Sequence, residues 1–242
     1  MEYICPYIFL LIMIYLLMAL APVSAIILYV LSKDKFDKEP PKVLIICFVL
    51  GIICALPAAI VEELLIPIID VRNFILDFIQ AFCIIALAEE GAKYIIVRYY
   101  AYHRPSFNEP LDGIVYSLMV SMGFAAIENI MYVYEGGVAI AILRALTAVP
   151  AHATFAIVMG YFVGKAKFHK NSNSTKNLMI GFIGAVILHG AYDYCIITIE
   201  YLYIGLGALI SLIIGIRLSL KALKEYHEHS MLTHSNSKKD MV

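Results

Sequence analysis

Seven long apolar segments follow one another along this sequence, and they constrain its fold more than any other feature. By inspection they cover about 7–31, 43–61, 74–97, 111–133, 138–164, 177–199 and 201–220. Each is long enough to cross a bilayer as a helix, which takes about 20 apolar residues. Because backbone N–H and C=O groups must be paired inside a membrane, we expect an all-α polytopic membrane protein with about seven transmembrane helices.

The composition agrees with a membrane protein and excludes other classes. Of the 242 residues, 62% are hydrophobic and only 15% are charged, whereas soluble domains carry about a quarter charged residues. The net charge of −1 leaves no basic face for nucleic acid. We therefore expect one integral-membrane domain over residues 1–223, followed by a polar, disordered cytoplasmic tail over 224–242.

The basic residues alternate between the loops and predict an orientation. Fifteen of the 18 Lys and Arg residues fall on one side of the predicted spans, and the exceptions are Arg72, Lys93 and Arg144. Basic residues prefer the cytoplasmic side of a membrane. The N-terminus is therefore expected outside and the C-terminus in the cytoplasm of a multi-pass cell-membrane protein.

Four neighbouring spans contain ionisable side chains, although each charge at the centre of a span costs roughly 2.5 to 3.5 kcal/mol. At 1.5 Å of rise per residue, they lie at compatible depths, which predicts a single cluster. These residues are Glu89, Glu90 and Lys93, then Glu128, then Arg144 and His152, and finally His189 and Asp193.

The spacing of these residues within the spans indicates an ion pair, a general acid or base, and an oriented imidazole. Glu89 and Lys93 are four residues apart and can form an ion pair on one helix face, while the adjacent carboxylate of Glu90 suits a general acid or base. Asp193 lies four residues after His189 and can accept from one ring nitrogen, which leaves the other free.

Two imidazoles with one or two carboxylates form the ligand set of a catalytic zinc site. The same cluster would equally suit the proton relay of a proton-coupled carrier, and a receptor or scaffold with a buried polar network is a third reading. The spacing alone does not choose among them.

Other polar and small residues are interpreted as structural. Glu62 and Glu63 are expected to be solvated at the outer interface, and Arg144 is expected to extend outward to the same interface. Gly160 and Gly164 are expected to mark a close contact between helices.

Four motifs resemble those of the PrsW family of intramembrane proteases, which are distant relatives of the CAAX prenyl proteases. The segment Glu89-Glu90-Gly-Ala-Lys93 resembles the family's EExxK motif, and His189-Gly-Ala-Tyr-Asp193 resembles its HxxxD motif. Gly123 to Asn129, with Glu128 before the Asn, and Pro150-Ala-His152 are similar as well. The likeness runs from about residue 33 to 198.

The resemblance implies a metallopeptidase of the bacterial plasma membrane that makes the first cut in a membrane-anchored anti-sigma factor. In this hypothesis Glu89 or Glu90 is the general base for water, and His152 and His189 bind a metal, expected to be zinc, or polarise the scissile carbonyl. Glu128 would be a further ligand, Asp193 would orient His189, and Lys93 would balance charge.

A metal-free mechanism also fits these residues. Glu89 and Glu90 would then share a proton, and the imidazoles would form an oxyanion site with the Asn129 amide.

Overall fold

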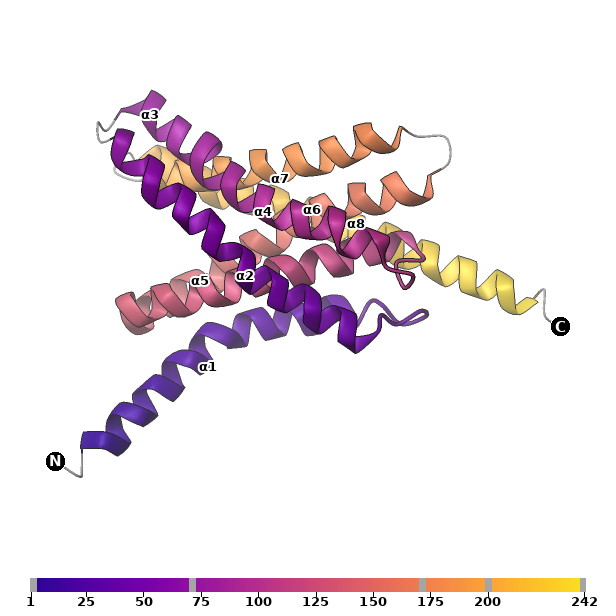
Figure 1. The fold of residues 1–242 in the computed structure, drawn as a ribbon, viewed down its shortest axis with the longest axis horizontal. Coiled ribbons are helices and arrows are strands. Elements are labelled where there is room, and N and C mark those ends of the chain that lie inside the picture. Colours follow the sequence, from indigo (N-terminus) through magenta and orange to yellow (C-terminus); the bar gives the residue numbers. More distant parts are fainter. Residues whose placement is uncertain (1–3, 70–72, 170–172, 199–201, 240–242) are drawn as a thin grey trace.

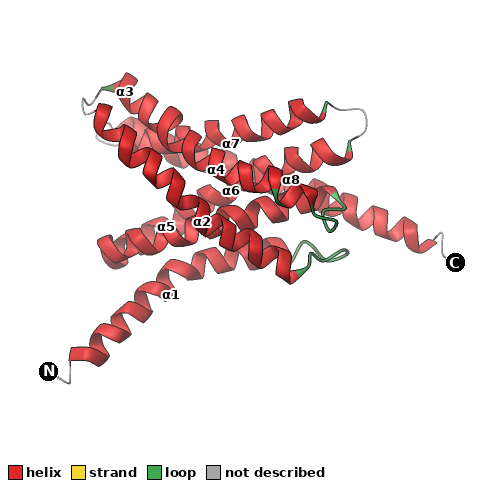
Figure 2. Ribbon diagram, in the orientation of Figure 1, coloured by secondary structure: helices red, strands yellow, loops and turns green. Residues whose placement is uncertain are grey.

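The computed structural model describes residues 4–69, 73–169, 173–198 and 202–239, and all regular structure in these ranges is helical (Figure 1 and Figure 2). This confirms the all-α prediction. In chain order the elements are α1 (Ile4–Leu31), α2 (Pro41–Leu65), η1 (Ile66–Ile69), α3 (Phe74–Phe78), η2 (Ile79–Ala86), α4 (Leu87–Tyr99), η3 (Ala101–His103), α5 (Pro110–Leu146), α6 (Ala148–Phe168), α7 (Ser174–Ile197) and α8 (Leu202–Lys239).

Within the described residues, four helical stretches are long and apolar enough to cross a membrane. Many of their large side chains face outward, as Ile53 and Leu56 of α2 do with 58% and 66% of their surface exposed, and in a bilayer such side chains contact lipid. The four stretches are Ile8–Leu31, Pro41–Ile69, Pro110–Phe168 and Ser174–Ile197. The third includes both α5 and α6.

Polar and proline residues define where several helices begin. Pro41 is the first residue of α2, a position where its missing N–H costs nothing. Glu109 and Asp112 form a reciprocal capping box at the start of α5. The Asn173 side chain accepts a hydrogen bond from Lys176 N at the start of α7. These signals fix the helix ends next to the polar loops.

The expected span 74–97 is a continuous helical run made of α3, η2 and α4. Its middle part, η2, has the wider turns of a π-helix. Such segments are rare and frequently occur at functional sites. Here η2 ends three residues before Glu89 and therefore leads directly into the EExxK motif.

The helix α5 reverses direction at Gly137, whose φ of 67° and ψ of −157° are not helical. Glycine tolerates a positive φ because it has no Cβ. After this reversal, residues 138–146 run back along the preceding segment until a second break at Thr147. The expected span 138–164 is therefore interrupted, and α6 begins only at Ala148.

Glycines allow three helices to approach closely. A Cβ added to Gly51 of α2 would lie 2.0 Å from Val120 O of α5. A Cβ added to Gly160 of α6 would lie 2.3 Å from Gly113 O, and one added to Gly164 would lie 2.2 Å from Pro110 O. The predicted close contact at Gly160 and Gly164 is thus confirmed, and α5 is its partner.

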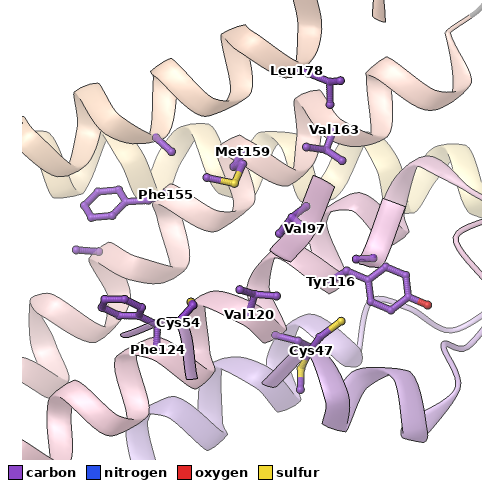
Figure 3. Packing of buried hydrophobic residues seen from close by; sticks show 14 of the residues in the cluster. Cys47, Cys54, Val97, Tyr116, Val120, Phe124, Phe155, Met159, Val163 and Leu178 are labelled. Carbon is purple, nitrogen blue, oxygen red and sulfur yellow. The ribbon is translucent and has the colours of Figure 1, made fainter. Parts of the chain in front are cut away.

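A buried apolar core joins these helices and surrounds the polar residues described below. Figure 3 shows part of it, where Cys54 of α2 and Phe124 of α5 lie near Phe155 and Met159 of α6. All four are less than 10% exposed. The core therefore holds α2, α5 and α6 in a fixed arrangement.

The tail that we expected to be disordered from residue 224 is helical as far as Lys239, because α8 continues past the last apolar segment. Residues 240–242 lie outside the described ranges. Tyr226 of α8 is buried, its hydroxyl donates to Tyr161 O at 2.8 Å, and the two rings stack. Packing against α6 explains why this part of α8 is ordered although its sequence is polar.

Candidate active site

The EExxK motif places three charged side chains of α4 in contact. Lys93 Nζ donates to Glu89 Oε2 at 2.9 Å and to Glu90 Oε1 at 2.8 Å. Glu90 and Lys93 are 0% and 1% exposed, and the ammonium also lies 4.0 Å from the centre of the Phe124 ring. The predicted pair of Glu89 and Lys93 is present, and Glu90 shares the same cation.

His152 of α6 lies between two charged groups. Its Nε2 is 2.7 Å from Glu128 Oε2, and its Nδ1 is 3.3 Å from Lys93 Nζ. A carboxylate accepts but does not donate, so its contact favours the tautomer with the proton on Nε2. The Nδ1 lone pair then faces the motif on α4.

His189 of α7 contacts carboxylates with both ring nitrogens. Its Nδ1 lies 3.0 Å from Glu90 Oε1, and its Nε2 lies 3.1 Å from Asp193 Oδ2 and 4.0 Å from Glu89 Oε2. Its ring stacks on Phe155 with 4.8 Å between the centroids. The expected contact of His189 with Asp193 is present, and the ring is fixed by packing as well.

The structure places Arg144 differently from our expectation. Its Nε donates to Asn129 Oδ1 at 2.8 Å, and its Nη2 lies 3.1 Å from Glu128 Oε1. The side chain is therefore turned toward the cluster and does not extend outward to the interface. The reversal at Gly137 falls in the expected loop between the fourth and fifth spans, and the break at Thr147 is the feature that hydropathy does not indicate.

The Asn129 amide is engaged at both ends. Its Nδ2 donates to Ala19 O of α1 at 2.7 Å, while its Oδ1 accepts from Arg144. Pro22, one turn further along α1, lacks an N–H and interrupts the hydrogen bonds of that helix. In this arrangement the buried Asn129 side chain connects α1 to Arg144 of the cluster.

The second acidic pair divides between two environments. Glu63 is exposed, as expected, but Glu62 is half-buried. Glu62 is also close enough to Glu89 and His189 to interact with both electrostatically. Glu62 is therefore more buried than expected, and it lies within electrostatic range of the cluster.

Four buried residues of three helices could together hold a metal ion. Glu89, Glu90, His152 and His189 each offer one ligand atom within 4.8 Å of the others. Glu90 Oε2 is buried and has no hydrogen-bond partner. Nitrogen and oxygen donors in equal number suit a borderline cation such as Zn²⁺. Glu128 lies outside this group, although we expected it to be a ligand.

An all-helical membrane domain with two carboxylates and two imidazoles in one buried group defines a class, the intramembrane metalloproteases. The comparison with protein families agrees, because the model for the PrsW family of intramembrane metalloproteases matches residues 39–218. The chain belongs to this family.

Relatives named Protease PrsW align over most of the chain. The protein of Oceanobacillus iheyensis is 40% identical over 175 residues, which are 72% of this chain and 79% of the relative. That of Clostridioides difficile is 32% identical over 88% of this chain and 92% of its own length. The Bacillus subtilis protein is 32% identical over 75% and 82%. No solved structure matches the chain.

Proposed function

We propose that this intramembrane protease cuts a membrane-anchored regulatory protein, and that its substrate is an anti-sigma factor cut at the first site. The observation that carries the hydrolytic site is the buried group of Glu89, Glu90, His152 and His189. The motif resemblance supports the substrate. The reaction is the addition of water across a peptide bond.

In this proposal, Glu89 is the general base that takes the proton from the attacking water. Its side chain is 8% exposed, whereas that of Glu90 is 1% exposed, so a peptide can reach Glu89 more readily. Glu90 holds His189 and Lys93 in place through Oε1. Lys93 balances the negative charge of both carboxylates.

His152 and His189 are the proposed nitrogen ligands of a zinc ion, and Glu90, whose Oε2 has no hydrogen-bond partner, is the proposed oxygen ligand. A bound zinc would lower the pKa of a coordinated water to about 7 and polarise the scissile carbonyl. Asp193 orients His189, and Glu128 orients His152 from outside the ligand group, as partners of ligating imidazoles commonly do.

Elemental analysis of protein purified without chelator tests the metal. We expect about one zinc per chain, lost in His152→Ala and in His189→Ala. Full activity of a preparation freed of metal by chelation would contradict this and favour activation by the two glutamates.

Cleavage is tested by incubating the purified protein with membrane-anchored anti-sigma factors and identifying the fragments by mass spectrometry. Glu89→Gln should reduce the rate at least about 100-fold, because the amide is nearly isosteric but is not a base. Glu63→Gln is the matched control, since Glu63 is exposed on α2. Equal rates for both variants would contradict the assignment of the base.

We also propose seven spans with the N-terminus outside, in the bacterial plasma membrane. The alternation of basic residues supports this orientation. In a cysteine-free background, a cysteine at Glu135 should react with an impermeant reagent in intact cells, and one at Ser174 should not. Both positions are exposed. Labelling at Ser174 alone would reverse the orientation.

A further inference from the structure

The chain reversal at Gly137 brings together residues that are far apart along a helix. Arg144 lies 15 residues after Asn129, a separation of about 22 Å in a straight helix, yet its Nε donates to the Asn129 side chain at 2.8 Å. The short returning segment 138–146 therefore presents Arg144 to the segment that carries Glu128. No motif of the family resemblance includes this arginine.

Arg144 has well-defined partners on several sides. Its guanidinium contacts Asn129 through Nε and forms an ion pair with Glu128 through Nη2, although the angle at Nη2 is not that of a hydrogen bond. The group also lies 4.2 Å from the centre of the Tyr132 ring, and only 11% of the side chain is exposed. A planar guanidinium can satisfy these contacts together, whereas a lysine ammonium offers a single point charge.

Each carboxylate oxygen of Glu128 has its own partner. Oε1 faces Arg144 at 3.1 Å, and Oε2 faces His152 Nε2 at 2.7 Å. The carboxylate is 22% exposed, so without Arg144 it could rotate toward the solvated side and leave the imidazole. The position of Glu128 therefore depends on the arginine.

We propose that Arg144 is a positioning residue for hydrolysis. It holds Glu128 against His152 Nε2, which keeps the ring proton on that nitrogen and directs the Nδ1 lone pair toward Glu89 and Lys93. This inference rests on the proposed function, but which ring nitrogen of His152 carries the proton can be measured without any substrate.

The first test measures the tautomer directly. In protein freed of metal by chelation, so that no bound ion fixes the tautomer, with ¹⁵N-labelled histidine rings and in lipid bilayers, the His152 signals are assigned by their loss in His152→Ala. Wild type and Arg98→Gln should both carry the proton on Nε2, since Arg98 is a cation of α4 whose contacts, with His103 and with two tyrosine rings, lie outside the cluster. In Arg144→Gln the His152 signals should shift to a mixture of tautomers. An unchanged spectrum would overturn the proposal.

The second test is a double-mutant cycle on cleavage of an anti-sigma factor. Arg144→Gln and Glu128→Gln should each lower kcat about 10- to 100-fold with little change in KM, the usual size for a partner of an active imidazole. If Arg144 acts through Glu128, the double variant should equal Glu128→Gln within about twofold. Losses that multiply would overturn the proposal.

Arg144→Lys keeps the charge and guards against a variant that fails to fold. It should elute like wild type in gel filtration yet lose about tenfold in kcat, because one ammonium cannot replace the guanidinium. Wild-type activity in this variant would show that charge alone suffices and would overturn the proposal. If the wild type cleaves no substrate while the tautomer result holds, the proposed function fails and the positioning role stands.

Discussion

Two groups of buried carboxylates lie in this protein, and their surroundings differ. The first is the active-site cluster, where Lys93 and Arg144 contact the glutamates of α4 and α5. The second, which we call the helix-start cluster, consists of Asp34, Glu39 and Asp112 beside the first turns of α2 and α5. These three residues are 3%, 6% and 0% exposed.

The helix-start cluster has hydrogen bonds but, in the part of the chain that the structure describes, no basic side chain in direct contact. Asp112 Oδ2 accepts from the backbone N–H groups of Asn108 and Glu109, both at 2.7 Å, and Tyr116 Oη donates to Glu39. Among the described residues, no Lys or Arg forms an ion pair with any of its three carboxyl groups. Burial, with Asp112 beside it, raises the pKa of Glu39 to about 10.

The difference shows how one chain keeps buried acids in two states. A carboxylate with a cation in contact can stay ionised for chemistry, whereas one without a cation retains its proton and serves structure. Substitutions in each cluster test this difference.

Removal of the shared cation should have the largest effect. Lys93→Met leaves Glu89 and Glu90 buried without a counter-charge, so the free energy of unfolding should fall by about 3–5 kcal/mol. Lys224→Met is the control, because its pair with Glu228 is exposed and should contribute less than about 1 kcal/mol. Thermal unfolding in detergent measures both.

A second change can show that the loss comes from charge. Addition of Glu90→Gln to Lys93→Met removes one unpaired carboxylate and should recover part of the stability. A double variant no more stable than Lys93→Met would mean that Lys93 acts through packing.

A glycine follows a carboxylate in each cluster, and the two glycines should respond differently to alanine. At Gly113, after Asp112, a Cβ would lie 2.4 Å from Gly160 O, so Gly113→Ala should cost about 1–3 kcal/mol. At Gly91, after Glu90, nothing lies within 4 Å, and alanine should be neutral or slightly stabilising. Equal melting temperatures for the two variants would show that the helices separate easily at Gly113.

Taken per pH unit, the smallest expected effect is a pH dependence of stability from Glu39. Between its ordinary pKa of 4.5 and about 10, the folded protein holds a proton that the unfolded chain has released. The free energy of unfolding should therefore fall as pH rises, by at most about 1.4 kcal/mol per pH unit. Glu39→Gln should flatten the curve of melting temperature between pH 6 and pH 9. Parallel curves for variant and wild type would contradict the proton that we place on Glu39 in the folded protein.

Local spacing along a helix predicted part of the site. Glu89 with Lys93, and His189 with Asp193, meet because residues four apart share a helix face. The contacts of His152 with Glu128 and of His189 with Glu90 join different helices, and depth along each span predicted only that these residues would be near one another. The residue that each imidazole contacts on another helix could be assigned only from the packing of the helices in the structure.

The position of Arg144 could not be predicted from hydropathy, which gives residues 138–164 as a single span. The structure interrupts that span at Thr147, so Arg144 belongs to a short returning segment. Glu62 was misplaced for a related reason, since the span limits gave its depth but not the helix face on which it lies.

The Gly137 reversal also bears on how the protein enters its membrane during synthesis. Glu128 and Arg144 belong to one hairpin, and Lys93 lies within one helical turn of both glutamates of α4, so these three carboxylates are inserted close to a cation of the same segment. Local pairing offsets part of the roughly 2.5 to 3.5 kcal/mol that a lone charge would cost at the centre of a span. These ion pairs can form within a single hairpin or helical turn, so they do not depend on the later association of the helices, whereas the contacts of the two imidazoles with other helices do.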